Sequence, residues 1–211
     1  MRATALPLLV SFLFFSCSNK EGNSDATANN SQKQDTAVAI KPDNSINSYA
    51  PVDVSPMDMS YFPVDYPIQK MSGSITTPPL ARVVYSRPHL QGRNLFQDVL
   101  KYGEPWRLGA NEATELHLYK DAIIQGKKIK AGRYTLYSIP EKDKWTIVLN
   151  TNIDSWGLHP DPSKDLARFI VTPNQTNNSI EYFTIIFQST TTGANLLMAW
   201  GNVEIQLTVI F

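Results

Sequence analysis

The residues best suited to chemistry in this chain stand close together, between Tyr85 and Thr114. Three arginines in that segment could bind an anionic group through their planar sets of N–H donors. Tryptophan rings could offer flat apolar platforms, and an amide and a carboxylate beside them could orient a ligand by hydrogen bonds. The sequence therefore predicts a ligand-binding cleft. Its candidate residues are Arg87, Arg93, Trp106, Arg107, Asn111, Glu112 and Trp156.

A purely structural interpretation of the same segment stays open. The arginines could form bidentate ion pairs with Glu104 and Glu112. Asn111 and Gly109 could then shape the turn into the next strand. Polar networks of this kind often fix loops on β-scaffolds. The two interpretations differ in whether these side chains face a cleft or face one another.

Catalytic chemistry has weaker support in the sequence. No serine stands in a Gly-x-Ser-x-Gly motif. Glu104 with Glu112 or Glu115 could form the carboxylate pair of a glycoside hydrolase, but acidic pairs occur in most chains. We expect neither a metal nor another cofactor, because no histidine shows a recognised metal-ligand spacing; the histidines are His89, His117 and His159.

The segment from Tyr85 to Thr114 reads YSRPHLQGRNLF, then a short helical stretch, then YGEPWRLGANEAT. This pattern resembles the signature of the DUF2911 family of exported Bacteroidetes proteins and lipoproteins. Further similarity follows at residues 131–140 (AGRYTLYSIP), at 145–150 (WTIVLN) and at Trp156-Gly157, after which residues 158–162 depart from the family pattern. The resemblance covers nearly the whole predicted domain. It implies no particular activity, because the family has no assigned biochemical function.

The elements that must position these residues are short strands. Runs of β-branched and aromatic residues with period-two alternation indicate a β-rich domain at residues 80–211. In Thr114–Tyr119, for example, Leu116 and Leu118 share one face while Glu115 and His117 share the other. About nine such runs, without a repeated strand–helix pattern, predict an all-β fold: an antiparallel β-sandwich or a jelly-roll-like barrel.

Two local details complete this prediction. One short helix is expected at Leu95–Tyr102, with Asn94 as its N-cap and Gly103 in the left-handed conformation at its end. The last two strands are expected at Ala194–Trp200 and Val203–Phe211.

The N-terminal residues indicate export and lipid attachment. Arg2 precedes an apolar run that is shorter than the about 20 residues needed to span a bilayer. Residues 1–16 therefore read as a lipoprotein signal peptide, and Cys17, the only cysteine, as the site of lipid attachment. Ser18 stands where Asp would favour inner-membrane retention, so we expect the outer membrane.

Two further segments separate Cys17 from the domain. Residues 17–47 contain no aromatic residue, and we expect a disordered tether that carries the domain away from the bilayer. Residues 48–79 are expected to form a Pro-rich extended arm. Its aromatic residues should pack on the domain like a strap, while its prolines should prevent regular structure.

These observations favour a lipid-anchored protein of the cell envelope, facing the periplasm or the cell surface. Its domain is expected to bind a small polar or carbohydrate ligand without catalysis. A structural or protein-interaction module and a glycan-acting hydrolase remain the alternatives. The chain has 19 basic and 19 acidic residues, and this balance argues against nucleic acid as a partner. The expected partner is the membrane, reached through the anchor.

Overall fold

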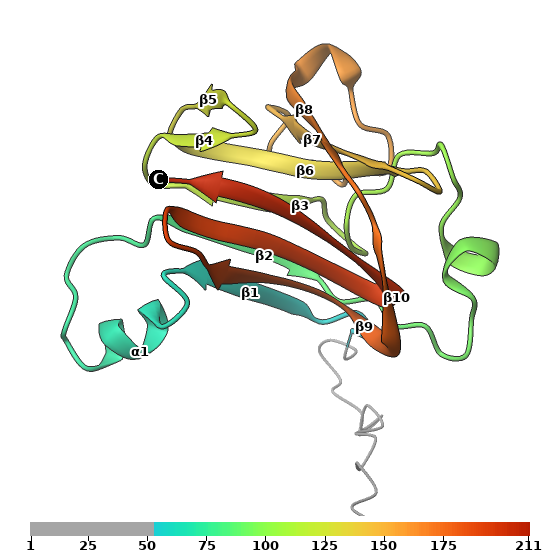
Figure 1. Cartoon of the computed structure of the whole chain (residues 1–211), viewed down its shortest axis with the longest axis horizontal. Coiled ribbons are helices and arrows are strands. Elements are labelled where there is room, and N and C mark those ends of the chain that lie inside the picture. The colour runs from blue at the N-terminus through green and yellow to red at the C-terminus, as the bar shows by residue number, and fades with distance from the viewer. Residues whose placement is uncertain (1–52) are drawn as a thin grey trace, which may run out of the picture. The chain divides into compact units, whose positions relative to one another are not determined.

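Two antiparallel sheets make up residues 53–211, the part of the chain that the computed structural model describes (Figure 1). The six-stranded sheet has the order β1-β2-β3-β6-β7-β8, and the four-stranded sheet has the order β5-β4-β10-β9. The predicted sandwich-like all-β fold is confirmed, with ten strands in place of about nine. The strands are β1 Met57–Phe62, β2 Ala81–Ser86, β3 Thr114–Leu118, β4 Ala122–Ile124, β5 Lys127–Ile129, β6 Gly132–Pro140, β7 Trp145–Asn150, β8 Asp165–Val171, β9 Asn174–Ser189 and β10 Gly193–Ile210.

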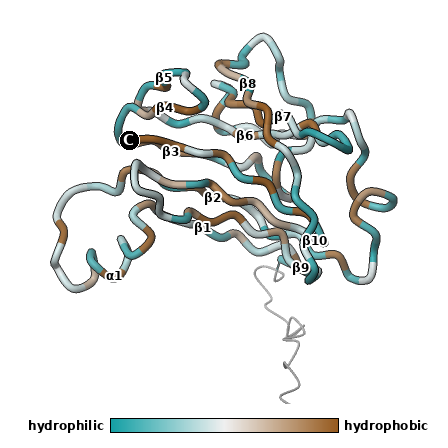
Figure 2. The backbone as a smooth tube through the Cα atoms, in the orientation of Figure 1, coloured by the Kyte–Doolittle hydropathy of each residue, from teal (hydrophilic) through white to brown (hydrophobic). Residues whose placement is uncertain are grey.

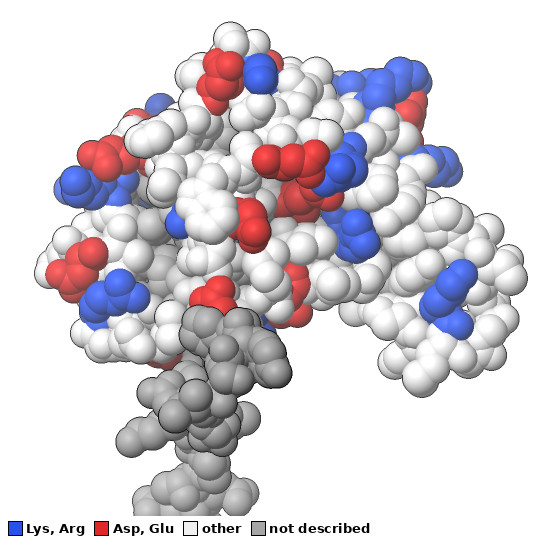
Figure 3. Space-filling view, turned by 180° about the vertical axis from the view of Figure 1, so that it is seen from behind, with Lys and Arg blue, Asp and Glu red and all other residues white. Residues whose placement is uncertain are grey.

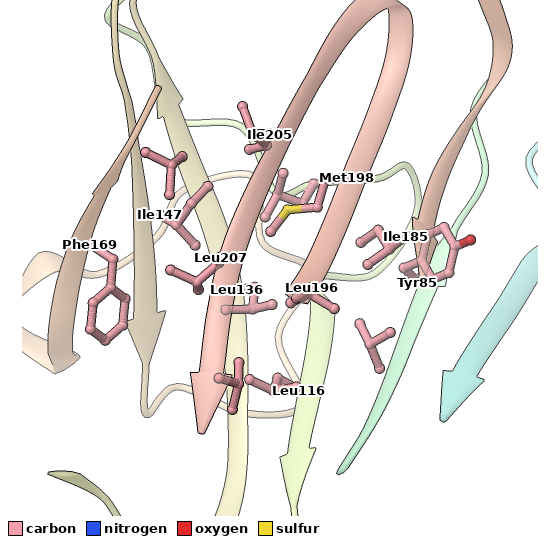
Figure 4. Close-up of a cluster of buried hydrophobic side chains, with 14 of the residues drawn as sticks. Tyr85, Leu116, Leu136, Ile147, Phe169, Ile185, Leu196, Met198, Ile205 and Leu207 are labelled. Atoms are coloured by element: carbon pink, nitrogen blue, oxygen red, sulfur yellow. The ribbon is translucent and has the colours of Figure 1, made fainter. Parts of the chain in front are cut away.

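The core lies between the two sheets because alternate residues of each strand point inward. In β2, Ala81, Val83 and Tyr85 are buried, whereas Arg82 and Val84 are partly exposed on the other face. Hydrophobic residues recur in this way along the strands of both sheets (Figure 2). Figure 4 shows the side chains that fill the interior: Tyr85, Leu116, Leu136, Ile147 and Phe169 from the six-stranded sheet, and Ile185, Leu196, Met198, Ile205 and Leu207 from the four-stranded sheet.

The last two predicted strands are one continuous strand, β10. Gly201 has a φ of 58°, and the pairing of β10 with β9 shifts register on both sides of it. Such a bulge bends a strand without ending it, and glycine adopts the required backbone conformation without strain. The prediction of two separate strands was therefore wrong at this point.

The arm before β2 contains regular structure that its prolines were expected to prevent. β1 runs from Met57 to Phe62 and pairs antiparallel with β2. Helix α1, Tyr66–Met71, follows it and has a proline in its first turn. The prolines at positions 56 and 63 flank β1 and so remove none of its hydrogen bonds. β1 is therefore part of the six-stranded sheet, although it lies before residue 80, the predicted start of the domain.

The predicted helix at Leu95–Tyr102 is shorter than expected. Asn94 caps it as predicted, since its side-chain oxygen accepts hydrogen bonds from the backbone N–H groups of Phe96 and Gln97. It is a π-helical turn that spans only Leu95–Val99, because Leu100 adopts an extended conformation. Leu95 and Leu100 are buried, so the turn packs on the sheets as expected. A short 3-10 turn, Pro162–Lys164, precedes β8.

Several predictions concern residues that lie outside the described part of the chain. These are the signal peptide at residues 1–16, lipid attachment at Cys17, the tether at residues 17–47 and the start of the arm at residues 48–52. Within residues 53–211, no helix has both the length and the apolar character needed to cross a bilayer.

Candidate functional site

An open groove of about 620 Å³ lies on the outer face of the six-stranded sheet. Arg82 and Val84 of β2 line it, because they alternate with the buried residues of that strand. Across the sheet, Val84 pairs with Glu115 of β3 and Glu115 pairs with Thr135 of β6, so all three belong to the same face. We call this the Trp156 groove. Its other lining residues are Met57, Glu112, Ala113, Asp154, Ser155 and Trp156.

The loop that carries Trp156, residues 151–164, is tied to the sheet by partly buried hydrogen bonds. The side-chain amide of Asn150 donates to the Asp161 carbonyl and to the Asp165 carboxylate, both at 2.8 Å. Tyr137 donates to the same carboxylate at 3.0 Å. Burial, reinforced by this hydrogen bond, raises the pKa of Tyr137 to about 12. Trp156 is therefore presented by a loop whose start and end are both held in place.

A close backbone contact fixes Trp156 itself. Gly157 has a φ of 78°, and a Cβ atom at this position would lie 2.8 Å from the Cβ of Ala113. Arg107, whose pKa is lowered by burial, donates through Nη1 to the Trp156 carbonyl at 3.2 Å. Its guanidinium carbon lies 5.9 Å from the centroid of the Trp156 ring, within the range of a cation–π contact. Trp156 remains 54% exposed and forms an accessible flat surface.

Two of the groove's carboxylates are already paired with an arginine. Arg133 donates to both oxygens of Glu115, at 3.0 and 2.5 Å, and to Asp154 at 2.8 Å. The hydrogen bond with Glu115, followed by that with Asp154, raises the pKa of Arg133. Within residues 53–211, no three His, Cys, Asp or Glu side chains are grouped as a metal site would require.

The predicted ligand-binding residues do not share one concavity. Glu112 and Trp156 line the Trp156 groove. A second groove, of about 350 Å³, has Leu158 among its lining residues, and we call it the Arg93 groove. Three of the other predicted ligand-binding residues line it: Arg93, Trp106 and Arg107.

Trp106 packs against the hydrophobic core. Its ring stacks on Trp200 with centroids 5.5 Å apart, and it meets the edges of Trp145 at 6.3 Å and Phe183 at 4.8 Å. Its indole N–H donates to the Gly109 carbonyl at 3.2 Å. The aromatic cluster thus covers one face of the ring, in contrast to the exposed ring of Trp156.

The remaining two predicted residues hold the segment around β1. Arg87 pairs with Asp58 at 3.3 Å and donates to the Thr184 hydroxyl at 3.2 Å, so it joins β1 to β9. The side-chain amide of Asn111 donates to Asp53 and to the Ser55 carbonyl.

The ion pairs predicted for the arginines with Glu104 and Glu112 do not form. Arg93 donates instead to the backbone carbonyls of His89 and Leu90, at 2.7 and 2.9 Å. Glu104 lies on the surface, 3.7 Å from Lys101. Backbone carbonyls satisfy these arginines because loops leave many carbonyl groups without a partner in a sheet.

The sequence did not point to Arg82 and Asp154, two charged residues that line the groove, or to Arg133, which pairs with Asp154 and Glu115. Single charges that alternate with apolar residues in a strand normally indicate a solvated face. The alternation placed Arg82 on the outer face, but its nearness to Trp156 depends on strand pairing and on a distant loop. On the face turned to the viewer in Figure 3, acidic and basic side chains are interspersed, with no large area of one sign.

Comparison with known proteins identifies one similarity. A family model described as a protein of unknown function, DUF2911, matches residues 67–209. No curated protein and no solved structure matches the chain.

Proposed function

The chain belongs to the DUF2911 family, whose function is unknown, and we propose that its domain binds a carbohydrate or another small polar ligand in the Trp156 groove without catalysis. The observation that carries this proposal is the exposed ring of Trp156, held rigidly at the side of an open groove lined with charged groups. Small-ligand sites commonly combine an aromatic side chain in a concave surface with a few polar groups that orient the ligand.

The groove has the mixed character that a sugar requires. A pyranose ring has an apolar face of C–H groups, which suits a flat indole, and a rim of hydroxyl groups. Carboxylate oxygens accept hydrogen bonds from hydroxyl groups. Glu112 is exposed beside Trp156 in the same lining, so it can accept from a ligand that stacks on the ring.

Binding is favoured over glycoside hydrolysis by the state of Glu115. A glycosidase needs two carboxyl groups that flank the scissile bond, one of them able to donate a proton. Both oxygens of Glu115 accept hydrogen bonds from Arg133. Glu115 is therefore held by Arg133, and Glu112 has no free carboxyl group of Glu115 with which to form a catalytic pair.

A protein-interaction module is the second candidate, because one surface favours it. The loop around α1 extends away from the two sheets (Figure 1) and carries exposed apolar side chains. Met71 is 84% exposed and Ile68 is 66% exposed, and Val64 is exposed beside them in the sequence. Exposed apolar side chains gathered in one segment are a common feature of protein contact sites.

The proposed location is the outer membrane, facing the periplasm or the cell surface. Support comes from the sequence alone: an apolar run at residues 3–15, then Ser16 and the single Cys17, followed by Ser18. In this proposal, lipid on Cys17 holds the chain to the membrane, and the polar residues that follow allow the domain to reach ligands away from the bilayer.

A glycan-array screen of the purified chain, repeated with two variants, tests the proposed binding function. Trp156→Ala should weaken binding of any retained glycan at least about tenfold, which corresponds to about 1.4 kcal/mol. Leu158→Ala is the matched control, since Leu158 is exposed on the same loop but lines the Arg93 groove. Equal binding by wild type and Trp156→Ala would contradict the proposal. Loss of binding only in Leu158→Ala would move the site to the Arg93 groove.

A further inference from the structure

Two neighbouring polar groups beside the Trp156 groove have no partner. Four buried side-chain nitrogen or oxygen atoms within residues 53–211 lack a hydrogen bond, and two of them are Arg82 Nε and His117 Nδ1. Arg82 of β2 and His117 of β3 are direct cross-strand partners, so these atoms belong to one place on the outer face. Because native proteins pair nearly all buried polar atoms, two unpaired ones at a single place require an explanation.

Of the two arginines that pair with His117 across the sheet, only Arg82 has no counter-ion in the part of the chain that the structure describes. The next residue across the sheet from His117 is Arg133, which is held by Glu115 and Asp154. Within the described residues, no carboxylate forms an ion pair with Arg82. Arg82 is also among the residues that line the groove. A positive charge that faces a groove and has no protein partner is suited to an anionic ligand group.

We infer that the ligand of the Trp156 groove is an anionic saccharide, whose acidic group binds the guanidinium of Arg82 while its ring stacks on Trp156. This inference rests on the proposed function and adds the charge of the ligand to it. Carboxylate, sulfate and phosphate groups share the geometry that an arginine binds with two N–H donors. A free inorganic anion would leave Trp156 unused, so the saccharide accounts for both features.

The missing hydrogen bond of Arg82 Nε should affect the thermal stability of the chain. An arginine whose Nε is buried without a hydrogen bond destabilises the folded chain, because the group has lost its water without gaining a partner. Replacing it by Gln should therefore leave the thermal midpoint of the chain unchanged or raise it. This expectation makes Arg82→Gln a suitable test variant, since loss of binding would not be caused by loss of folding.

Calorimetric titration of the purified full-length chain with matched saccharides tests the inference. The probes are glucose with glucuronate, glucose with glucose 6-sulfate, and galactose with galacturonate. We expect each acidic sugar that binds to bind at least about tenfold more tightly than its neutral partner, and Arg82→Gln to remove the difference. Arg93→Gln is the control, because Arg93 lines the other groove and donates to backbone carbonyls. It should retain the preference.

The outcomes separate the inference from the proposed function. Equal affinity for acidic and neutral sugars, or a preference that survives Arg82→Gln, would overturn the inference and leave carbohydrate binding in place. Binding of no sugar in any pair would overturn the inference and, within the proposed function, would rule against carbohydrate in favour of another small polar ligand. A preference for sulfate over carboxylate would support the inference and identify the acidic group.

His117 provides a second readout of the same event. Burial and the positive charges of Arg82 and Arg133 lower its pKa, whereas Glu115 opposes them; Tyr119 stacks on the ring. An anion bound at Arg82 would add negative charge beside the imidazole and raise this pKa. The imidazole resonances, followed by NMR across a pH titration, should therefore move to higher pH with glucuronate and stay unchanged with glucose. Identical titrations with both sugars would contradict binding at Arg82.

Discussion

Replacing Gly157 by Ala should destabilise the chain for two separable reasons. The first is backbone strain: Gly157 has a φ of 78°, and a residue with a Cβ atom costs about 1–2 kcal/mol in this conformation. The second is a steric clash, since the new Cβ would lie 2.8 Å from the Cβ of Ala113 and 3.1 Å from that of Arg107. Carbon atoms normally approach no closer than about 3.5 Å, and such overpacking costs about 1–3 kcal/mol.

Gly92 provides the matched control for this experiment. Its φ is 75°, and a Cβ atom placed there would have nothing within 4 Å. Gly92→Ala therefore carries the backbone strain without the clash. We expect it to lose about 1–2 kcal/mol and Gly157→Ala to lose about 2–5 kcal/mol. For a chain of this size, each kcal/mol lowers the thermal midpoint by about 2–4 °C.

Urea denaturation followed by tryptophan fluorescence would measure both free energies of unfolding. The difference between the two variants isolates the contact of Gly157 with Ala113 and Arg107. If both variants lose the same stability, that contact is not tight, and the argument that it fixes Trp156 is refuted. If the difference is present, Gly157→Ala should also weaken any ligand that stacks on Trp156, because the ring must move with the loop.

Two further predictions concern other parts of the chain. Cys17→Ser should release the protein from the membrane fraction and abolish labelling with palmitate, as measured by cell fractionation and metabolic labelling; a variant that stays labelled would exclude Cys17 as the attachment site. The pKa of His117 is lower in the folded chain than in the unfolded chain, so the unfolded chain binds a proton at this imidazole more readily. The contribution of neutral His117 to the free energy of unfolding is therefore full above about pH 6.5, and it is lost as the pH falls through the pKa of the folded state. Wild type should therefore lose more stability than His117→Gln between about pH 7 and pH 5 in paired denaturation curves. Equal losses would contradict this assignment.

Local sequence patterns were sufficient to predict most strands of the two sheets, but not where each strand or helix starts and ends. Period-two alternation identified β3, for example, because one face of this strand is buried between the sheets. β1 was missed because prolines surround it, although none of them interrupts its pairing with β2. The helix after Asn94 was overextended because cap residues indicate where a helix starts, whereas its length depends on how Leu100 packs.

The candidate site was predicted in part, and the reason lies in distance along the chain. Trp156 was recognised because it stands next to a loop, and Glu112 because it lies in a conspicuous polar segment. Arg82 was not recognised, since its relation to Trp156 is created by strand register and by a loop that is anchored through Asn150. The hydrophobic periodicity of one segment cannot show which residues of a distant segment lie beside it in the fold.

The position of β1 also determines where the domain can safely be shortened. β1 lies outside the region that matches the family model, yet it is the outermost strand on one side of the six-stranded sheet. A polypeptide that began at residue 80 would leave the N–H and C=O groups of β2 open along a full strand. Such an open edge readily recruits strands from other molecules, so that fragment would tend to aggregate. The residues before the matched region are therefore needed to complete the six-stranded sheet.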